Sequence, residues 1–317
     1  MAYNTLGPMD CGLEERFVGC MLGLALGDAL GAPHEGGPVE RLAWRLICLP
    51  SGGLLRWTDD TQMSMGLAES LLEVGGLDCG HAARVWARKL EVLRGYGPST
   101  RRILCAVRAG RPWQEACRSV FPQGSLGNGA AMRSAPLGLF FHRDPKALAD
   151  AAARAAQVTH AHPLGIAGGV LMARAAAAAL EPKFAPRRFL EALLAEVQAE
   201  EFRGRLRRAA DWAGCEPPAA EVRRVLGSGV RAHESAVTAL HVFCRHPADF
   251  AAMAEFSLSL GGDADTILSM AGGLFGARNG AGALPQDLLS RLEAREELER
   301  LGRGLFAQRA PAGSGGG

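Results

Sequence analysis

The chain has 317 residues, of which 48% are hydrophobic, and its 35 Lys and Arg nearly balance 33 Asp and Glu, leaving a net charge of +2. A net charge this close to zero gives the protein no strong electrostatic attraction to nucleic acid or to an acidic membrane. Only 6% of the residues are aromatic, so few side chains could stack on the bases of single-stranded nucleic acid. Without a CxxC pair, a secretory signal or an uncharged apolar run of membrane-spanning length, the sequence predicts a cytoplasmic monomer with reduced thiols and no nucleic-acid or membrane partner.

Helical periodicity dominates the chain from its N-terminal part onward. An apolar stretch at residues 17–30 is followed by Gly31 and Pro33, which end a first helix. Further apolar residues recur at steps of three and four from Thr61, over 164–180, 189–197 and 236–243, and again from Asp265. Because the two-residue alternation of strands is rare, we expect an all-α domain.

Glycines interrupt the predicted buried face of the last of these helices, at Gly272, Gly273 and Gly276. Glycine costs about 1 kcal/mol against alanine inside a helix, so this placement indicates a close approach of another helix. We expect an N-terminal arm at 1–15, a single domain at 16–309 and a disordered tail at 310–317, with residues 181–229 peripheral.

Two acidic clusters, WTDDT at residues 57–61 and GGDADT at residues 261–266, each stand directly before a predicted helix. Helix capping explains either cluster alone, since Asp and Thr are preferred N-caps and suit the helix dipole. A cap needs one side chain, however, and a second carboxylate beside it has no helical role. Paired carboxylates with a Thr hydroxyl form an oxygen-only ligand set, which suits Mg²⁺ or Mn²⁺ and not zinc.

Three loop motifs offer further polar groups. In GDALGAPHE (27–35), Asp28 is expected to brace or cap the fold, whereas Glu35 is either a mobile carboxylate within reach of a metal or a solvated loop residue. GSLGNGAAMR (124–133) is either a plain turn or a loop whose backbone N–H groups hold phosphate; it matches neither the Walker A nor the Rossmann pattern. In THAHP (159–163) the two histidines do not share a helical face, so one is expected in a pocket and the other at the surface.

These motifs, together with RGYGPSTRRIL and THAHPLGIAGG, stand in the order found in the ADP-ribosylglycohydrolase family, which the chain resembles over residues 16–280. The resemblance implies a compact orthogonal multi-helix bundle with two Mg²⁺ (or Mn²⁺) ions. The implied metal ligands are Thr58, Asp59, Asp60, Asp263, Asp265 and Thr266. The implied substrate-binding residues are Tyr96 and Gly97 in the cleft, Ser125, Gly127, Asn128 and Gly129 around the diphosphate, and His160 near the distal ribose.

The expected activity is hydrolysis of the glycosidic bond between ADP-ribose and a modified protein side chain, with arginine slightly preferred and serine possible. Asp60, and after it Glu35, are the candidates for the general base. The alternatives are a hydrolase of small ADP-ribosyl conjugates and a catalytically silent relative that binds ADP-ribose or serves structurally; the latter predicts eroded carboxylates, and none is missing. One departure is Leu126, which stands where some members of the family place an aromatic residue.

Overall fold

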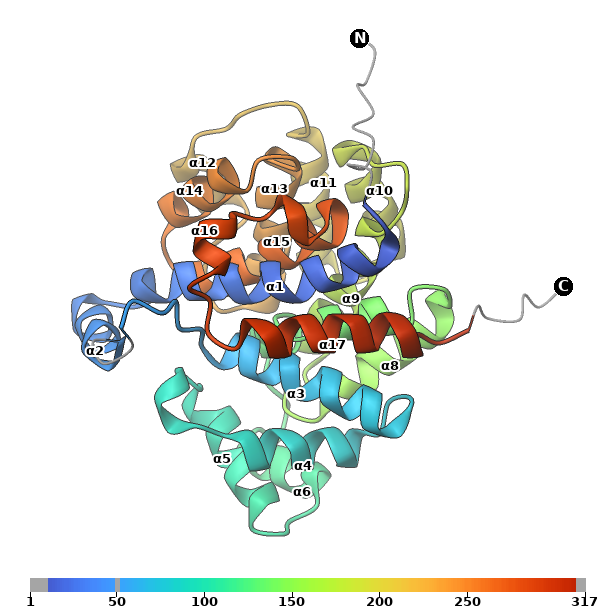
Figure 1. Ribbon diagram of the computed structural model, residues 1–317. Helices are drawn as coiled ribbons and strands as arrows, with labels where there is room; N and C mark the ends of the chain where they lie inside the picture. The colour runs from blue at the N-terminus through green and yellow to red at the C-terminus, as the bar shows by residue number, and fades with distance from the viewer. Residues whose placement is uncertain (1–10, 49–51, 312–317) are drawn as a thin grey trace, which may run out of the picture.

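Two long buried helices, α1 (Leu13–Gly31) and α15 (Ala264–Asn279), lie against each other at the centre of the molecule (Figure 1). The structure, a computed structural model, describes residues 11–48 and 52–311. A Cβ atom added to Gly19 would lie 2.5 Å from the carbonyl oxygen of Gly276, and one added to Gly23 would overlap the carbonyl of Gly272. The predicted close approach of another helix is confirmed for Gly272 and Gly276, and α1 is that helix.

The first of these helices is strongly apolar because it is a core element. With the 3-10 turn η1 (Ala32–His34), the segment Leu13–His34 is long and apolar enough to cross a membrane, and within the described ranges no other helix meets both criteria. However, 83% of the window is buried inside the fold. A helix surrounded by protein on all sides is hydrophobic all round, so burial accounts for this composition.

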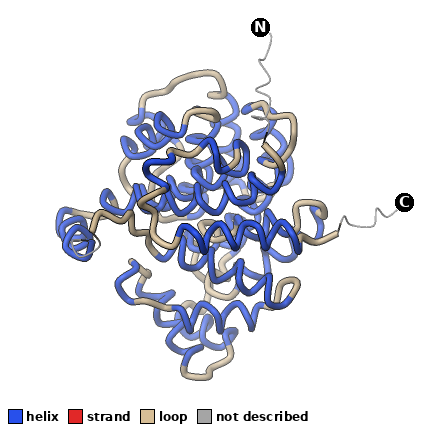
Figure 2. The backbone as a smooth tube through the Cα atoms, viewed as in Figure 1, coloured by secondary structure: helices blue, strands red, loops and turns tan. Residues whose placement is uncertain are grey.

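The remaining helices surround the central pair, and Figure 2 shows only helices and loops in the described part of the chain. This confirms the all-α prediction. The helices are α2 (Pro38–Cys48), α3 (Asp59–Val74), α4 (Cys79–Lys89), α5 (Pro98–Arg108), α6 (Trp113–Val120), α7 (Ala135–Phe140), α8 (Pro145–Gln157), α9 (Pro163–Ala179), α10 (Pro186–Glu196), α11 (Glu200–Asp211), α12 (Ala219–Val225), α13 (Ala232–Arg245), α14 (Phe250–Leu260), α16 (Gln286–Leu289) and α17 (Arg295–Gln308). Helix α17 packs on both α1 and α3, while α9 and α13 pack on α15, so the two ends of the chain share one core.

Residues 181–229 are less peripheral than the sequence indicated. They form α10, α11 and α12, and Leu190, Phe202 and Leu206 on these helices are fully buried. The segment is therefore an outer layer whose inner face belongs to the core. At the chain ends, α1 begins at Leu13, inside the predicted arm, and most of the predicted tail lies outside the described residues.

Helix α5 packs on both α4 and α6, and the three helices form a lobe below α3 in Figure 1. The connection from α4 to α5 contains the 3-10 turn η3 (Val92–Arg94) and Gly95, whose φ of 87° is readily adopted only by glycine. This connection and the first turn of α5 face the loops that carry the two acidic clusters, so the lobe forms one wall of the site described next.

Candidate active site

A pocket of about 280 Å³ brings the two acidic clusters together, although about two hundred residues separate them in sequence. Its wall also contains Glu35, the loop at 125–129 and the rim that the α4–α6 lobe contributes. The residues that line it are Glu35, Asp59, Asp60, Gly95, Gly97, Pro98, Ser99, Thr100, Phe121, Ser125, Gly127, Asn128, Gly129, Met132, His160, Val230, Asp263, Asp265 and Thr266.

The first cluster begins α3, and its capping is done by Thr58. The Thr58 hydroxyl accepts the backbone N–H of Asp60 at 3.3 Å, and the Thr58 N–H lies 3.0 Å from both carboxylate oxygens of Asp28. Asp28 also accepts the Thr61 hydroxyl at 2.5 Å, which confirms that it braces the fold. Since cap and brace are already supplied, the Asp59 and Asp60 carboxylates on the pocket wall are not needed to cap α3.

The second cluster begins α15 with a turn that glycine permits. Gly262 has a φ of 76°, and a Cβ atom there would overlap the carbonyl oxygen of Ser228, which accepts the backbone N–H of Asp263 at 2.8 Å. Asp263 stands at the N-cap position of α15, but its side chain accepts no capping hydrogen bond. Instead its carboxylate accepts the side-chain amide of Asn128, so this turn is tied to the loop at 125–129.

The carboxylates fit a divalent cation. Glu35, Asp263 and Asp265 each offer an oxygen, and these oxygens all lie within 4.8 Å of one another. Asp60 Oδ2 and Asp265 Oδ1 are buried and have no hydrogen-bond partner among the described residues. A buried anionic oxygen without a partner is costly, and a hard cation would compensate several of them at once. The donors are all oxygens, the ligand type that hard divalent cations prefer.

The electrostatics of the cluster indicate the same need for positive charge. Burial, followed by the charge of Asp28, raises the pKa of Asp60 well above its ordinary value, and burial followed by Glu35 does the same for Asp265. Burial also raises the pKa of Asp263 to about 6, against the opposing hydrogen bond from Asn128. Full ionisation of this cluster at neutral pH therefore requires compensating positive charge.

The loop at 125–129 packs on the ring of His160. The Ser125 hydroxyl accepts the backbone N–H of Gly127 at 3.2 Å, and a Cβ atom added to Gly129 would lie 2.5 Å from His160 Cε1. His160 Nδ1 and the Thr159 hydroxyl lie 2.7 Å apart, which fixes the ring. Burial, with a smaller contribution from a nearby guanidinium, lowers the pKa of His160 to about 3, so the pocket holds a neutral imidazole.

That guanidinium belongs to Arg133, a buried residue that the sequence reasoning did not single out. It donates to the carbonyl of Gly129 at 2.6 Å and to that of Ala155 at 3.2 Å, and its cation lies 4.5 Å from the ring centre of Trp86. No Lys or Arg lines the pocket within the described part of the chain, so Arg133 puts positive charge beneath the loop without opening onto the cavity.

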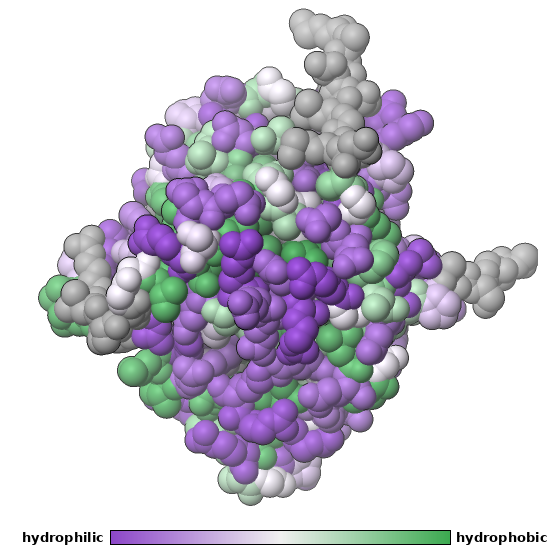
Figure 3. Space-filling model, viewed as in Figure 1, coloured by the Kyte–Doolittle hydropathy of each residue, from purple (hydrophilic) through white to green (hydrophobic). Residues whose placement is uncertain are grey.

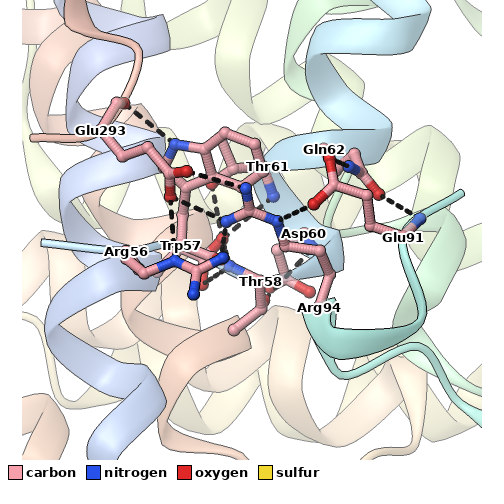
Figure 4. A network of polar contacts seen from close by, with 10 residues as sticks. Arg56, Trp57, Thr58, Asp60, Thr61, Gln62, Glu91, Arg94 and Glu293 are labelled. Carbon is pink, nitrogen blue, oxygen red and sulfur yellow. Dashed lines mark hydrogen bonds and ion pairs between the residues drawn. The ribbon is translucent and has the colours of Figure 1, made fainter. Parts of the chain in front are cut away.

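A second buried arginine, Arg94, secures the loop that leads into α3 (Figure 4). Its guanidinium lies 3.8 Å from the ring centre of Trp57, donates to the Trp57 carbonyl at 3.0 Å and pairs with both carboxylate oxygens of Glu293 at 2.8 Å. The indole N–H of Trp57 in turn donates to the Glu293 carbonyl at 3.0 Å. The first acidic cluster is thus anchored to the C-terminal part of the chain.

Two sequence predictions at the edge of the site need correction. Tyr96 does not line the pocket: it is buried behind the rim, where its hydroxyl donates to Gln62 at 2.8 Å, whereas Gly97 does line the pocket. His162 is not simply a surface residue, because its Nδ1 accepts the backbone N–H of Leu164 at 3.1 Å and caps α9.

Thr58 lies beneath the pocket as a cap, and its predicted role as a metal ligand stays a prediction.

Sequence reasoning also missed two apolar residues of the pocket wall, Phe121 and Val230. Phe121 directly follows α6, and Val230, 63% of whose surface is exposed, accepts the backbone N–H of Asn128. Neither belongs to a polar motif, so nothing in the local sequence marked them. Leu126, which stands where some members of the family place an aromatic residue, does not line the pocket.

The chain is similar to known proteins over nearly its whole length. A family model described as ADP-ribosylglycohydrolase matches residues 9–315. ADP-ribosylhydrolase ARH3 of Gallus gallus is 30% identical over 92% of this chain and 92% of its own, and an uncharacterized protein of Archaeoglobus fulgidus is 32% identical over 93% and 97%. A solved structure of an ADP-ribosylglycohydrolase-related protein complex superposes with a TM-score of 0.71 at 29% identity, covering 94% of this chain and 99% of that one.

Proposed function

Because the chain belongs to the ADP-ribosylglycohydrolase family over nearly its whole length, we propose that it is a metal-dependent hydrolase of the bond between ADP-ribose and a modified protein side chain. The observation that carries this proposal is the meeting of two carboxylate clusters in one pocket with two buried oxygens unpartnered. We further propose that the protein acts as a cytoplasmic monomer. The ligands of two Mg²⁺ or Mn²⁺ ions would be Thr58, Asp59, Asp60, Asp263, Asp265 and Thr266.

The reaction breaks the bond at the anomeric carbon of the distal ribose, where oxocarbenium character develops. When bound by these residues, Mg²⁺-class ions would supply Lewis acidity to the ribose oxygens and to the attacking water. Asp60 accepts the proton of the attacking water, with Glu35 as the alternative base, and such general-base help is worth about 10²–10⁴-fold. The carboxylates around the pocket also favour the developing positive charge, and in this proposal the fixed ring of His160 contacts the ribose.

The rest of the pocket suits the nucleotide part of the substrate. The N–H groups of Gly127 and Asn128 are already donated to the Ser125 hydroxyl and the Val230 carbonyl, so the diphosphate would be held by the remaining N–H groups of residues 125–129, and the guanidinium of Arg133 below the loop favours that negative charge. Leu126 has no aromatic ring to stack on a nucleobase, and Phe121 provides that aromatic surface instead. The pocket therefore offers a separate surface for each of the three parts of ADP-ribose.

The linkage is tested by incubating the protein with arginine-linked and serine-linked ADP-ribosyl peptides, and with a small ADP-ribosyl conjugate, in Mg²⁺ and in EDTA. We expect free ADP-ribose only with Mg²⁺, with the arginine linkage slightly preferred, and none from Asp60→Asn. Release from the small conjugate alone would support the second candidate activity. Binding of ADP-ribose without release from any of the three would identify a silent relative and contradict the proposal.

A further inference from the structure

The α4–α6 lobe, residues 79–120, carries an unusual concentration of positive charge. It contains nine Arg and Lys residues and two Glu, a net charge of +7, whereas the whole chain carries +2. The rest of the chain therefore sums to −5. The near-neutral total hides a separation of charge between this lobe and the remainder of the molecule.

Most of the lobe's positive charge is solvent-exposed and unpaired. Two of its nine basic side chains have carboxylate partners: Lys89 contacts Glu69, and Arg94 is paired with Glu293. The other seven are exposed arginines, and none of them has a carboxylate within 4.0 Å in the described part of the chain. These are Arg84, Arg88, Arg101, Arg102, Arg108, Arg111 and Arg118.

On α5 the exposed arginines begin directly after the residues that line the pocket. Pro98, Ser99 and Thr100, in the first turn of α5, line the pocket, and Arg101 and Arg102 follow directly on the same helix. Figure 3 colours the visible surface of the lobe as mostly hydrophilic. Two exposed basic residues therefore follow the pocket wall directly along α5, on the lobe side of an acidic pocket.

We propose that this arginine-rich lobe docks an acidic polypeptide segment that flanks the ADP-ribosylated residue, an inference that rests on the proposed function. Guanidinium groups bind carboxylates through paired hydrogen bonds, and a surface of one sign raises the association rate of an oppositely charged partner by about 10–10³-fold. A nucleic-acid partner is less suited, because all three aromatic side chains of the lobe, Trp86, Tyr96 and Trp113, are buried or half-buried and offer no exposed stacking platform.

The test compares two ADP-ribosylated peptides with the same linkage, one with Asp and Glu around the modified residue and the other with Asn and Gln. The variant is Arg101→Gln/Arg102→Gln. Its matched control is Arg207→Gln/Arg208→Gln, a second pair of adjacent exposed arginines without a carboxylate within 4.0 Å in the described part of the chain, on α11 at the opposite end of the molecule (Figure 1). For each protein kcat/KM is measured at low and high NaCl, and binding of the unmodified acidic peptide is followed by fluorescence anisotropy.

We expect wild type and the control to hydrolyse the acidic peptide about tenfold more efficiently than the neutral one at low salt, and the Arg101/Arg102 variant to lose this preference. High salt should remove it from all three proteins. Equal rates on both peptides, a variant that keeps the preference, or stronger competition by an oligonucleotide than by poly-glutamate of equal charge would overturn the inference. Absence of hydrolysis of every substrate would instead refute the proposed function, and anisotropy would still decide whether the lobe binds the acidic peptide.

Discussion

Replacing Asp263 by Asn should stabilise the metal-free protein at neutral pH, although it removes a residue of the proposed metal site. Burial raises the pKa of Asp263 to about 6 in the folded chain, against about 3.9 in the unfolded chain. A group whose pKa is raised by folding gives its full stability below the unfolded value and loses it as the pH rises through the folded value. The difference of about 2 in pKa corresponds to about 3 kcal/mol, or roughly 5 °C in Tm for a chain of this size.

The assay is the Tm of both proteins in EDTA between pH 4 and pH 7.5. The wild-type curve alone is not diagnostic, because buried His160 and His241, whose pKa values fall to about 3 and about 4, act in the opposite sense. Their folded pKa values lie below the unfolded value of about 6.5, so they add stability as the pH rises toward it. Both proteins contain these histidines, so subtracting the curves removes their effect.

The difference between variant and wild type should widen by about 2 kcal/mol from pH 4 to pH 7 and then stay level. A hundredfold excess of Mg²⁺ over its Kd should stabilise the wild type by about 2.7 kcal/mol and the variant much less. A difference that does not change with pH, or a variant less stable than wild type in EDTA at pH 7.5, would show that burial of this carboxylate is not the cost inferred here.

Three further predictions follow from the site. Asp60→Asn should lower turnover by at least about 10²-fold with helix content preserved and without a lower Tm in EDTA, because Asn also removes a buried charge; full activity with a lower Tm would restore the capping explanation. Gly129→Val should weaken ADP-ribose binding measured by calorimetry, because its side chain would displace His160, and unchanged affinity in a folded variant would exclude this loop from the site. Asp59→Ala and Asp263→Ala should each lose most of the metal-induced rise in Tm, and the double variant little more, whereas losses that add would indicate two independent sites.

The sequence predicted those parts of the fold and site that local patterns encode. Helices α3, α9 and α15 follow from apolar residues at helical spacing, and the acidic clusters follow from carboxylates beyond what a cap requires. Asp28 was correctly expected to brace the fold, because a lone carboxylate at the end of an apolar helix needs buried donors. These features are readable because their physical cause lies within a few residues of them.

The features that escaped prediction depend on a distant partner. Arg94 and Glu293 are 199 residues apart, and neither belongs to a recognisable pattern until the fold joins them. Gly19 and Gly23 resemble weak points of a helix until the backbone of α15 is placed against them. Tyr96 was expected in the pocket because its segment resembles one that lines the cleft in the family, but no sequence pattern shows which way a side chain on an irregular rim points.

The contact between α1 and α15 also has a consequence for the synthesis of the protein. About 250 residues separate Gly23 from Gly272, and a ribosome that adds about 5–20 residues per second needs roughly 12–50 s to make them. During that time α1, which is made well before α15, has neither the helix that covers its glycine face nor the second acidic cluster. An apolar helix whose surface stays uncovered for so long is prone to aggregation. We therefore expect the nascent chain to depend on chaperones until its C-terminal quarter has been made.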